Sequence, residues 1–364
     1  MKCKRILSML LTLCMVMSLF AGTTVTASAA DGATTLYVNG VNMLSDSSTT
    51  PTGVSYDKST NTLTLQNAAL EQFHTDTANT DYDWKYAAVI YAVGGDLTIK
   101  LIGDNKITYN FTSEKIQCIC GIYFNNVNLT ITGTGTLAIQ NTATESKANY
   151  YKDICGEENS SLTIDGTKVE CVADSAENTL PAQVCGISLS KGALKVHNGQ
   201  LTVRTRNTTS TAYGIELFGN EPHILNGNSQ ITAVEGNDGV QKSSGFCGIC
   251  CFSTIQLGAG AKLYASGAEM AISENDSSIT AADGAMLSVK GKQEYNASSG
   301  LTEILIHNNT IKANAVKNYK TIEVTASAST PAAPTFTDGF GNNIDNANTY
   351  VKDKTTNDKG YTFA

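Results

Sequence analysis

The feature that most constrains the fold of this chain is a sequence repeat. The same order of motifs recurs along the chain: an aromatic residue or Cys, then Gly-Ile, then Leu-Thr-Ile or a close variant, a glycine turn and a second apolar alternation. The glycines at positions 121, 156, 186, 214 and 248 are 35, 30, 28 and 34 residues apart. With degenerate copies, the pattern occurs seven times. Repeats of this length are typical of solenoids, propellers and other arrays.

Each copy contains three short runs in which apolar and polar residues alternate, which predicts strands with one buried face. Three strands with turns need roughly 20 to 30 residues, the size of one coil of a parallel β-helix rather than of a propeller blade. The alternative is a β-sandwich of hairpins, but its strands do not repeat the same modules in a fixed order. We therefore expect an all-β fold, a parallel β-helix of about seven to nine coils.

The repeat also predicts the domain organisation. Residues 30–70 contain TTLYVNGVNML and VSYDKSTNTLTLQNA, which read as a hairpin cap and first coil because Asn39-Gly40 and residues 58–61 are turn sequences. The β-helix itself is expected over residues 71–327. Residues 328–364 contain prolines and no repeat, so they are either a linker that begins another module or a tail packed on the last coil.

The first 29 residues are predicted to be a secretory signal peptide. Lys2, Lys4 and Arg5 precede an apolar run, and residues 27–29 are small. Removal of these three cations changes the formal charge from −8 to −11, because the leader contains no acidic residue. An exported acidic chain is a poor partner for nucleic acid. No second apolar run is long enough to span a membrane, so we expect a secreted protein, either released or associated with the cell wall.

Eight cysteines remain after the predicted cleavage. In the register of the repeat, Cys120, Cys155, Cys185 and Cys247 are expected to form one column inside the core, as free thiols. The segment FCGICCF contains a Cys-x-x-Cys, but residues three apart on a regular strand point to opposite faces, so Cys247 and Cys250 are not expected to form a redox dithiol. The same geometry excludes a zinc site unless other coils contribute ligands.

Outward residues of the middle strand are expected to form two columns that present hydroxyl, amide and charged groups to a long polar polymer, although any solvent-facing sheet carries such groups. The first column contains Thr98, Thr130, Thr163 and Lys195, and the second contains Lys100, Thr132, Asp165, His197 and Asn226.

Acidic residues of one coil are candidates for a calcium site, because calcium needs several oxygen ligands. The candidates are Asp153, Glu157, Glu158 and Asp165.

Aromatic residues provide candidates for stacking on sugar rings. The candidates are Trp84 with Tyr82 and Tyr86, together with Tyr123. Aromatic residues in a loop equally often cover a hydrophobic core. His223 falls where other coils have a core leucine, so we expect a buried, hydrogen-bonded imidazole.

Several segments follow one another in the order LYVNG, VSYDKSTNTLTLQNA, DLTIKLIGDNKIT, and GIYF followed by LTITGTGTLAI. In this order they resemble a family of exported bacterial proteins described as carbohydrate-binding domain-containing. The resemblance covers roughly residues 34 to 327. It implies a right-handed parallel β-helix related to pectate lyases, with acidic pectic polymers and calcium as ligands.

A non-catalytic polysaccharide-binding protein is the function we expect. The alternatives are a polysaccharide lyase on the same fold, with Arg204 or Arg206 as its base, and a structural adhesin spacer. The polygalacturonase motifs Asp-Asp, His-Gly and Arg-Ile-Lys do not occur in the chain, and Asn-Thr-Asp occurs once, at residues 79–81, without them.

Overall fold

The computed structural model describes residues 32–46, 49–76, 86–110, 116–141, 150–174, 183–206, 211–235 and 246–266, and beyond these mainly the backbone of strands between residues 270 and 363. All of them belong to one compact unit, Gly32–Ala364. The predicted leader, residues 1–29, lies outside the described residues. Every regular element in the described ranges is a β-strand. Among the same residues there is no helix that is long and apolar enough to cross a membrane.

The strands form three sheets. The first sheet has twenty strands: β1 (Thr35–Val38), β2 (Val41–Asn42), β3 (Val54–Asp57), β4 (Thr62–Gln66), β6 (His74–Thr75), β7 (Tyr86–Ile102), β9 (Cys118–Gly133), β11 (Tyr150–Glu157), β12 (Ser161–Asp165), β14 (Gln183–Leu189), β15 (Leu194–His197), β17 (Thr211–Leu217), β18 (His223–Asn226), β20 (Phe246–Cys251), β21 (Ile255–Leu257), β23 (Met270–Glu274), β24 (Ser278–Ala281), β26 (Glu303–His307), β28 (Thr321–Thr325) and β31 (Thr349–Val351). The second has nine: β5 (Ala69–Leu70), β8 (Asp104–Tyr109), β10 (Thr136–Asn141), β13 (Lys168–Asp174), β16 (Gln200–Arg206), β19 (Gln230–Glu235), β22 (Lys262–Ser266), β25 (Met286–Lys290) and β27 (Ile311–Asn314). The third contains β29 (Phe336–Asp338), β30 (Asn343–Ile344) and β32 (Tyr361–Phe363).

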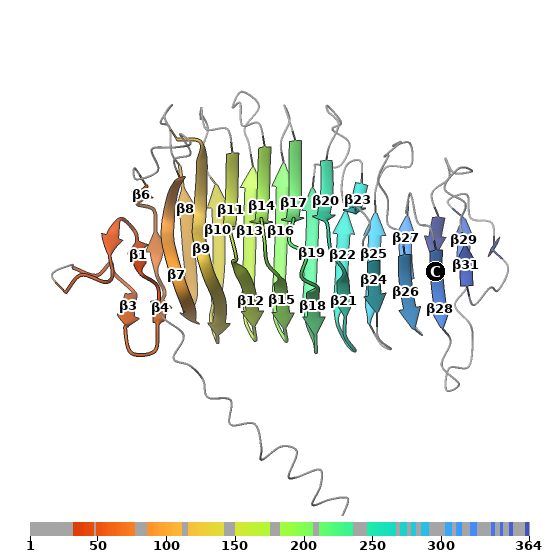
Figure 1. Cartoon of the computed structure of the whole chain (residues 1–364), viewed down its shortest axis with the longest axis horizontal. Helices are drawn as coiled ribbons and strands as arrows, with labels where there is room; N and C mark the ends of the chain where they lie inside the picture. The colour runs from red at the N-terminus through yellow and green to blue at the C-terminus, as the bar shows by residue number, and fades with distance from the viewer. Residues whose placement is uncertain are drawn as a thin grey trace, which may run out of the picture. The chain divides into compact units, whose positions relative to one another are not determined.

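The arrangement is a parallel β-helix, as predicted. A typical coil, such as β11, β12 and β13, contributes two strands to the first sheet and one to the second, and each strand pairs in parallel with its counterpart in the next coil (Figure 1). In β7 and β9 the first two strands of the coil are continuous. Six coils lie between residues 86 and 266, and each contributes one strand to the second sheet, from β8 to β22. This is slightly fewer than the seven to nine expected for the whole chain.

The core consists of columns of aliphatic side chains that stack from coil to coil. One column contains Leu97, Leu129, Leu162 and Leu194, each at most 1% exposed. A facing column on the second sheet contains Ile107, Ile139, Cys171 and Val203, all fully buried. Burial of one such Leu or Ile side chain contributes about 1.5 to 3 kcal/mol, so the inward alternation of the repeat stabilises the stack.

The first strand of each coil bends, and at the bend two consecutive residues face inward. In β7, Val89 and Ile90 both lie in the core, whereas Ala88 and Tyr91 lie in a second cluster on the outer face of the sheet. The strict period of two therefore fails here. Residues three apart across the bend, such as Ala88 and Tyr91, share the outer face.

In β9 and β14 the repeated glycine occupies the first of these two inward positions, where the core is narrow, whereas β7 has Val89 there. A Cβ atom on Gly186 would lie 2.0 Å from Cγ1 of Val203, and one on Gly121 would lie 2.4 Å from Cγ2 of Ile139. Gly156 does not belong to this column, contrary to the register predicted from the sequence. It pairs with Phe124, whereas Asp153 takes the position of the glycine.

Antiparallel strands lie at both ends of the helix. At the N-terminus β1 pairs with β7, and β3 forms a hairpin with β4. The predicted Asn39-Gly40 turn is confirmed, since both residues have positive φ angles of 51° and 77°. At the C-terminus β31 pairs antiparallel with β28, so part of the tail covers the edge of the last coil.

We predict that Gly186→Ala destabilises the protein by about 1 to 3 kcal/mol, because the added methyl group overpacks the core against Val203. The free energy of unfolding from urea titration measures the effect. Val203→Ala removes the clashing methyl groups, so the double variant should be more stable than the sum of the two single changes predicts. Simple additivity would contradict the proposed contact.

Candidate functional site

The two outward columns predicted from the sequence are present in the structure. Backbone pairing places Thr98 beside Thr130, Thr130 beside Thr163 and Thr163 beside Lys195. The second column is also in register, with Asp165 beside His197 and His197 beside Asn226. We call these nine side chains the polar ladder, which contains Thr98, Thr130, Thr163, Lys195, Lys100, Thr132, Asp165, His197 and Asn226.

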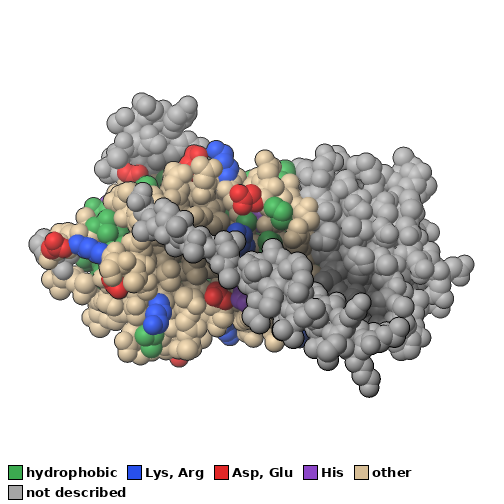
Figure 2. Space-filling view, turned by 60° about the horizontal axis from the view of Figure 1, so that its bottom comes forward, with side chains coloured by type: hydrophobic (Ala, Val, Ile, Leu, Met, Phe, Trp, Pro, Cys, Tyr) green, Lys and Arg blue, Asp and Glu red, His purple; other side chains and the backbone are tan. Residues whose placement is uncertain are grey.

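All side chains of the polar ladder are half-buried or exposed, and Lys100, Lys195, His197 and Asn226 are the exposed ones. A third column runs beside it, in which Asn128 donates a hydrogen bond of 2.9 Å to Asp96 and Ser161 donates one of 2.7 Å to Asn128. Figure 2 shows that uncharged polar side chains and backbone cover much of the described surface in that view, with a few separate charged groups. The ladder is therefore an ordered surface of hydrogen-bonding groups.

The four acidic residues predicted to bind calcium lie in different surroundings. Asp153 faces the core, where Tyr109 donates a hydrogen bond of 2.8 Å to it and burial raises the pKa of its carboxyl group well above the usual value. Glu157 is half-buried at the end of β11, and Glu158 is exposed and forms an ion pair with Lys191 at 3.2 Å. Asp165 lies in the polar ladder. Within the described residues these carboxylates do not form a group of three or more that could share an ion.

The predicted arginine base lies on the second sheet. Arg204 forms an ion pair with Glu170, with 3.5 Å between Nη1 and Oε1. Arg206 belongs to the same strand, β16, but its side chain lies outside the described residues, as do Trp84 and Tyr82. Tyr123 is only 3% exposed, and its ring centroid lies 4.9 Å from that of Tyr91 in a stacked arrangement.

The cysteines differ from the prediction in the register of one residue and in the face of the sheet that they occupy. Cys120, Cys185 and Cys247 share one column, with Lys152 and Tyr213 in the coils between them, as the repeat predicts. Cys155 does not belong to this column, because it pairs with Tyr123. Cys120 and Cys155 also face outward, in a buried outer cluster with Ala88, Tyr91, Cys118 and Tyr123. The bend in each first strand is the reason, because it turns the residue before the glycine away from the core. Cys247 and Cys250 pair with Tyr213 and Glu216, which occupy the two outer columns, so the argument from opposite faces does not hold for FCGICCF either.

Three of these cysteines converge. The Sγ atoms of Cys118, Cys120 and Cys155 all lie within 4.8 Å of one another, and those of Cys118 and Cys120 are 3.7 Å apart. We call this group the thiol triad. Its members are free thiols and at most 2% exposed. The triad consists of Cys118 and Cys120 from one coil and Cys155 from the next. It could not be predicted from a register in which Cys155 stood beside Cys120.

Electrostatics within the thiol triad favour one thiolate. Hydrogen bonds from Cys120 and Cys155 hold the pKa of Cys118 well below its usual value. Burial raises the pKa of Cys120, and the interaction with Cys118 raises the pKa of Cys155 to about 12. Burial also raises the pKa of Glu157 to about 7, and its Oε1 atom lies 3.6 Å from Sγ of Cys155.

A half-buried lysine lies beside the triad. Lys152 donates a hydrogen bond of 3.0 Å to Ser188, and Ser188 donates one of 2.9 Å to Glu216. Burial alone would lower the pKa of Lys152, but the negative groups of Cys155 and its neighbours outweigh that effect and raise the pKa well above its usual value. The outer face of β11 and β14 is therefore a buried polar site rather than a packing surface.

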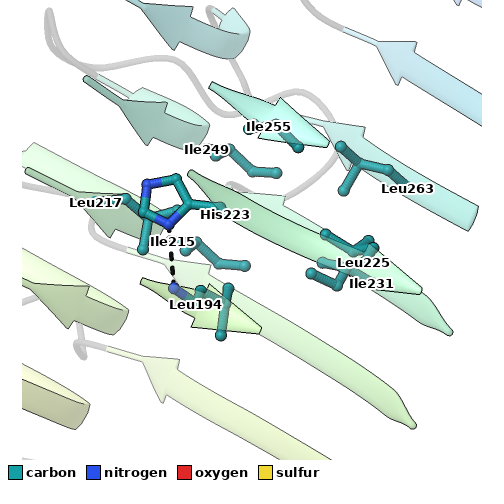
Figure 3. Close-up of a pocket in the computed structure, with 9 residues that line it drawn as sticks. All are labelled: Leu194, Ile215, Leu217, His223, Leu225, Ile231, Ile249, Ile255 and Leu263. Atoms are coloured by element: carbon teal, nitrogen blue, oxygen red, sulfur yellow. Dashed lines mark hydrogen bonds between the residues drawn. The ribbon is translucent and has the colours of Figure 1, made fainter. Parts of the chain in front are cut away.

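His223 is a separate buried polar residue, as predicted. Its Nδ1 atom accepts a hydrogen bond of 3.1 Å from the backbone N–H of Leu194, and burial lowers its pKa to about 4 (Figure 3). The ring borders a small cavity of about 10 Å³, measured as the space available to the centre of a water molecule. This is near the smallest volume that can hold one water. The other lining residues are all aliphatic: Leu194, Ile215, Leu217, Leu225, Ile231, Ile249, Ile255 and Leu263.

The fold places this chain in the class of parallel β-helix proteins. Comparisons with protein-family models, curated proteins and solved structures found no match to the chain. The polar ladder and the thiol triad are therefore the two features of the molecule from which a function can be inferred.

We predict that His223 makes the protein less stable as the pH falls from about 6.5 to about 4. In this range of pH the histidine of the unfolded chain binds a proton and that of the folded chain does not. The free energy of unfolding therefore falls by about 3 kcal/mol. In His223→Leu this loss should be absent, although at pH 7 the variant should be about 1 to 3 kcal/mol less stable because Leu194 N–H loses its acceptor. Urea titrations of both proteins at pH 7 and pH 4.5 measure the difference, and an identical pH dependence would contradict the assignment.

Proposed function

We propose that this protein is an extracellular, non-catalytic polysaccharide-binding β-helix, and that the polar ladder is its binding surface. The observation that supports this proposal is the register of the ladder. Its first column continues across consecutive coils from β7 to β15 and its second from β7 to β18, without interruption by a loop. Neighbouring rungs are about 4.8 Å apart, as in any sheet.

An extended polymer matches such a surface better than a small ligand does. The ladder offers hydroxyl, amide, ammonium and imidazole groups in two straight lines, and each of these groups can hydrogen-bond to sugar hydroxyl or carboxylate groups. A ligand that runs along the lines can contact several rungs at once. Weak hydrogen bonds of about 1 kcal/mol each then add to a useful affinity.

The charges of the ladder favour an acidic polymer, such as a pectic chain. Lys100 and Lys195 lie on β7 and β15, three rungs or roughly 14 Å apart along the stack, and only Asp165 among the ladder residues carries a negative charge. The expected mature charge of −11 nevertheless repels a polyanion. We infer that calcium acts as a bridge between the acidic protein and the polymer rather than as a resident ion.

The arrangement of the arginines supports binding rather than catalysis. A lyase needs a base beside the substrate, and Arg204 lies on the second sheet rather than in the ladder. Its guanidinium group also forms an ion pair with Glu170.

We predict that the mature protein is retained by immobilised polygalacturonate and that Lys195→Ala weakens binding roughly fivefold, the equivalent of one charge-assisted hydrogen bond of about 1 kcal/mol. Lys168→Ala is the matched control, because Lys168 is exposed on β13 of the second sheet. Retention is measured with calcium and with a chelator, and absorbance of unsaturated sugar is followed in the same samples.

Equal weakening in the Lys195→Ala and Lys168→Ala proteins would place binding outside the ladder. Retention that survives the chelator would contradict bridging by calcium. Formation of unsaturated product that depends on Arg204 would replace the binding proposal with a lyase. No retention in any sample would reject a pectic ligand.

A further inference from the structure

We propose that the thiol triad of Cys118, Cys120 and Cys155 binds one thiophilic d¹⁰ metal ion, with zinc as the ion that fits best. This inference is independent of polysaccharide binding, because the triad lies on the outer face of β9 and β11 and the polar ladder occupies other positions of the sheet.

The distances between the sulfur atoms carry the proposal. Zinc–sulfur bonds of about 2.3 Å in a tetrahedral site place two ligand sulfurs roughly 3.8 Å apart. Cys118 and Cys120 already have their sulfurs 3.7 Å apart, and Cys155 places its sulfur within 4.8 Å of both. A metal ion could therefore be bound by all three with small side-chain adjustments.

Disulfide formation is the competing use of these thiols, and the register does not favour it. Cys118 and Cys120 are two residues apart on one strand, which places their Cα atoms roughly 6.6 Å apart, at the upper limit for a disulfide. Cys155 stands opposite Tyr123 rather than opposite either cysteine. A disulfide would also leave the third thiol unused, whereas a metal ion uses all three.

Charge balance supports a divalent ion. Three thiolates and one divalent cation carry a net charge of −1, and an uncompensated charge is costly in a buried site. Lys152 stands in the outer column directly between Cys120 and Cys185, so its ammonium group supplies the compensating charge. The hydrogen bond to Ser188 holds the ammonium group in this position.

The fourth ligand is available beside the triad. Oε1 of Glu157 lies 3.6 Å from Sγ of Cys155, and the hydroxyl of Tyr86 lies 3.4 Å from the same oxygen. A carboxylate oxygen at this place can complete a tetrahedral site of three sulfurs and one oxygen, whose net charge of −2 the ammonium group of Lys152 reduces to −1. Tyr86 would then be the partner that orients the carboxylate.

Because the triad is buried, the ion would bind during folding and release the thiol protons. The test therefore uses the mature chain, reduced, unfolded and refolded with zinc, followed by dialysis and elemental analysis. We expect close to one zinc ion per chain. Cobalt refolded in its place should give the intense visible bands of a tetrahedral thiolate site.

Cys155→Ala should lose nearly all bound zinc. Cys171→Ala is the matched control and should retain it, because Cys171 is equally buried but faces the core on β13. Lys152→Met, which removes the compensating charge, should weaken zinc binding at least tenfold. Circular dichroism establishes that each variant is folded, and the cobalt spectrum of the unaltered chain tests the site without any substitution.

Three results would overturn the proposal. The first is less than about a tenth of an equivalent of zinc in the refolded protein, and the second is retention of zinc in Cys155→Ala. The third is a disulfide within the triad in the protein purified without reductant, detected by mass spectrometry as the loss of two hydrogens in a peptide containing these cysteines.

Discussion

The bend in the first strand of each coil is the constraint on which the other features depend. It requires two consecutive inward residues, and the first of them is a glycine in β9 and β14, where a Cβ atom would meet the second sheet, but Val89 in β7 and Asp153 in β11. The residues on either side of this pair are then turned outward together. The core, the outer cluster and the thiol triad are all consequences of this local departure from strict alternation.

The coil that begins at β11 shows what happens when the glycine is missing. Asp153 occupies the glycine position, and its carboxyl group lies in the core, where Tyr109 provides a hydrogen bond. The neighbouring Lys152 then faces outward beside the sulfur atoms of the triad. One irregular coil thus places a buried acid on the inner face and a half-buried cation on the outer face.

The fold could be predicted from the sequence because it depends on periodicity, which is written in each copy of the repeat. The outward columns of the second strand were predictable for the same reason, since residues such as Thr163 and Lys195 lie on regular strands. The thiol triad could not be predicted, because this required the correct register between an irregular copy of the repeat and its neighbours. The Cys-Gly pair at residues 155 and 156 suggested a register that is wrong by three residues. The predicted calcium ligands do not form one group among the described residues, because Asp153 takes the inward glycine position of β11 whereas Glu157 and Glu158 lie at the end of that strand and just beyond it.

The most direct test of this account is a crystal structure of the protein refolded with zinc, with diffraction data collected on both sides of the zinc absorption edge. We predict one anomalous peak bonded to the sulfurs of Cys118, Cys120 and Cys155, with the side chain of Asp153 on the opposite face of β11. A structure in which Cys155 stacks on Cys120 inside the core, with no anomalous peak on the outer face, would contradict both the bend and the metal site.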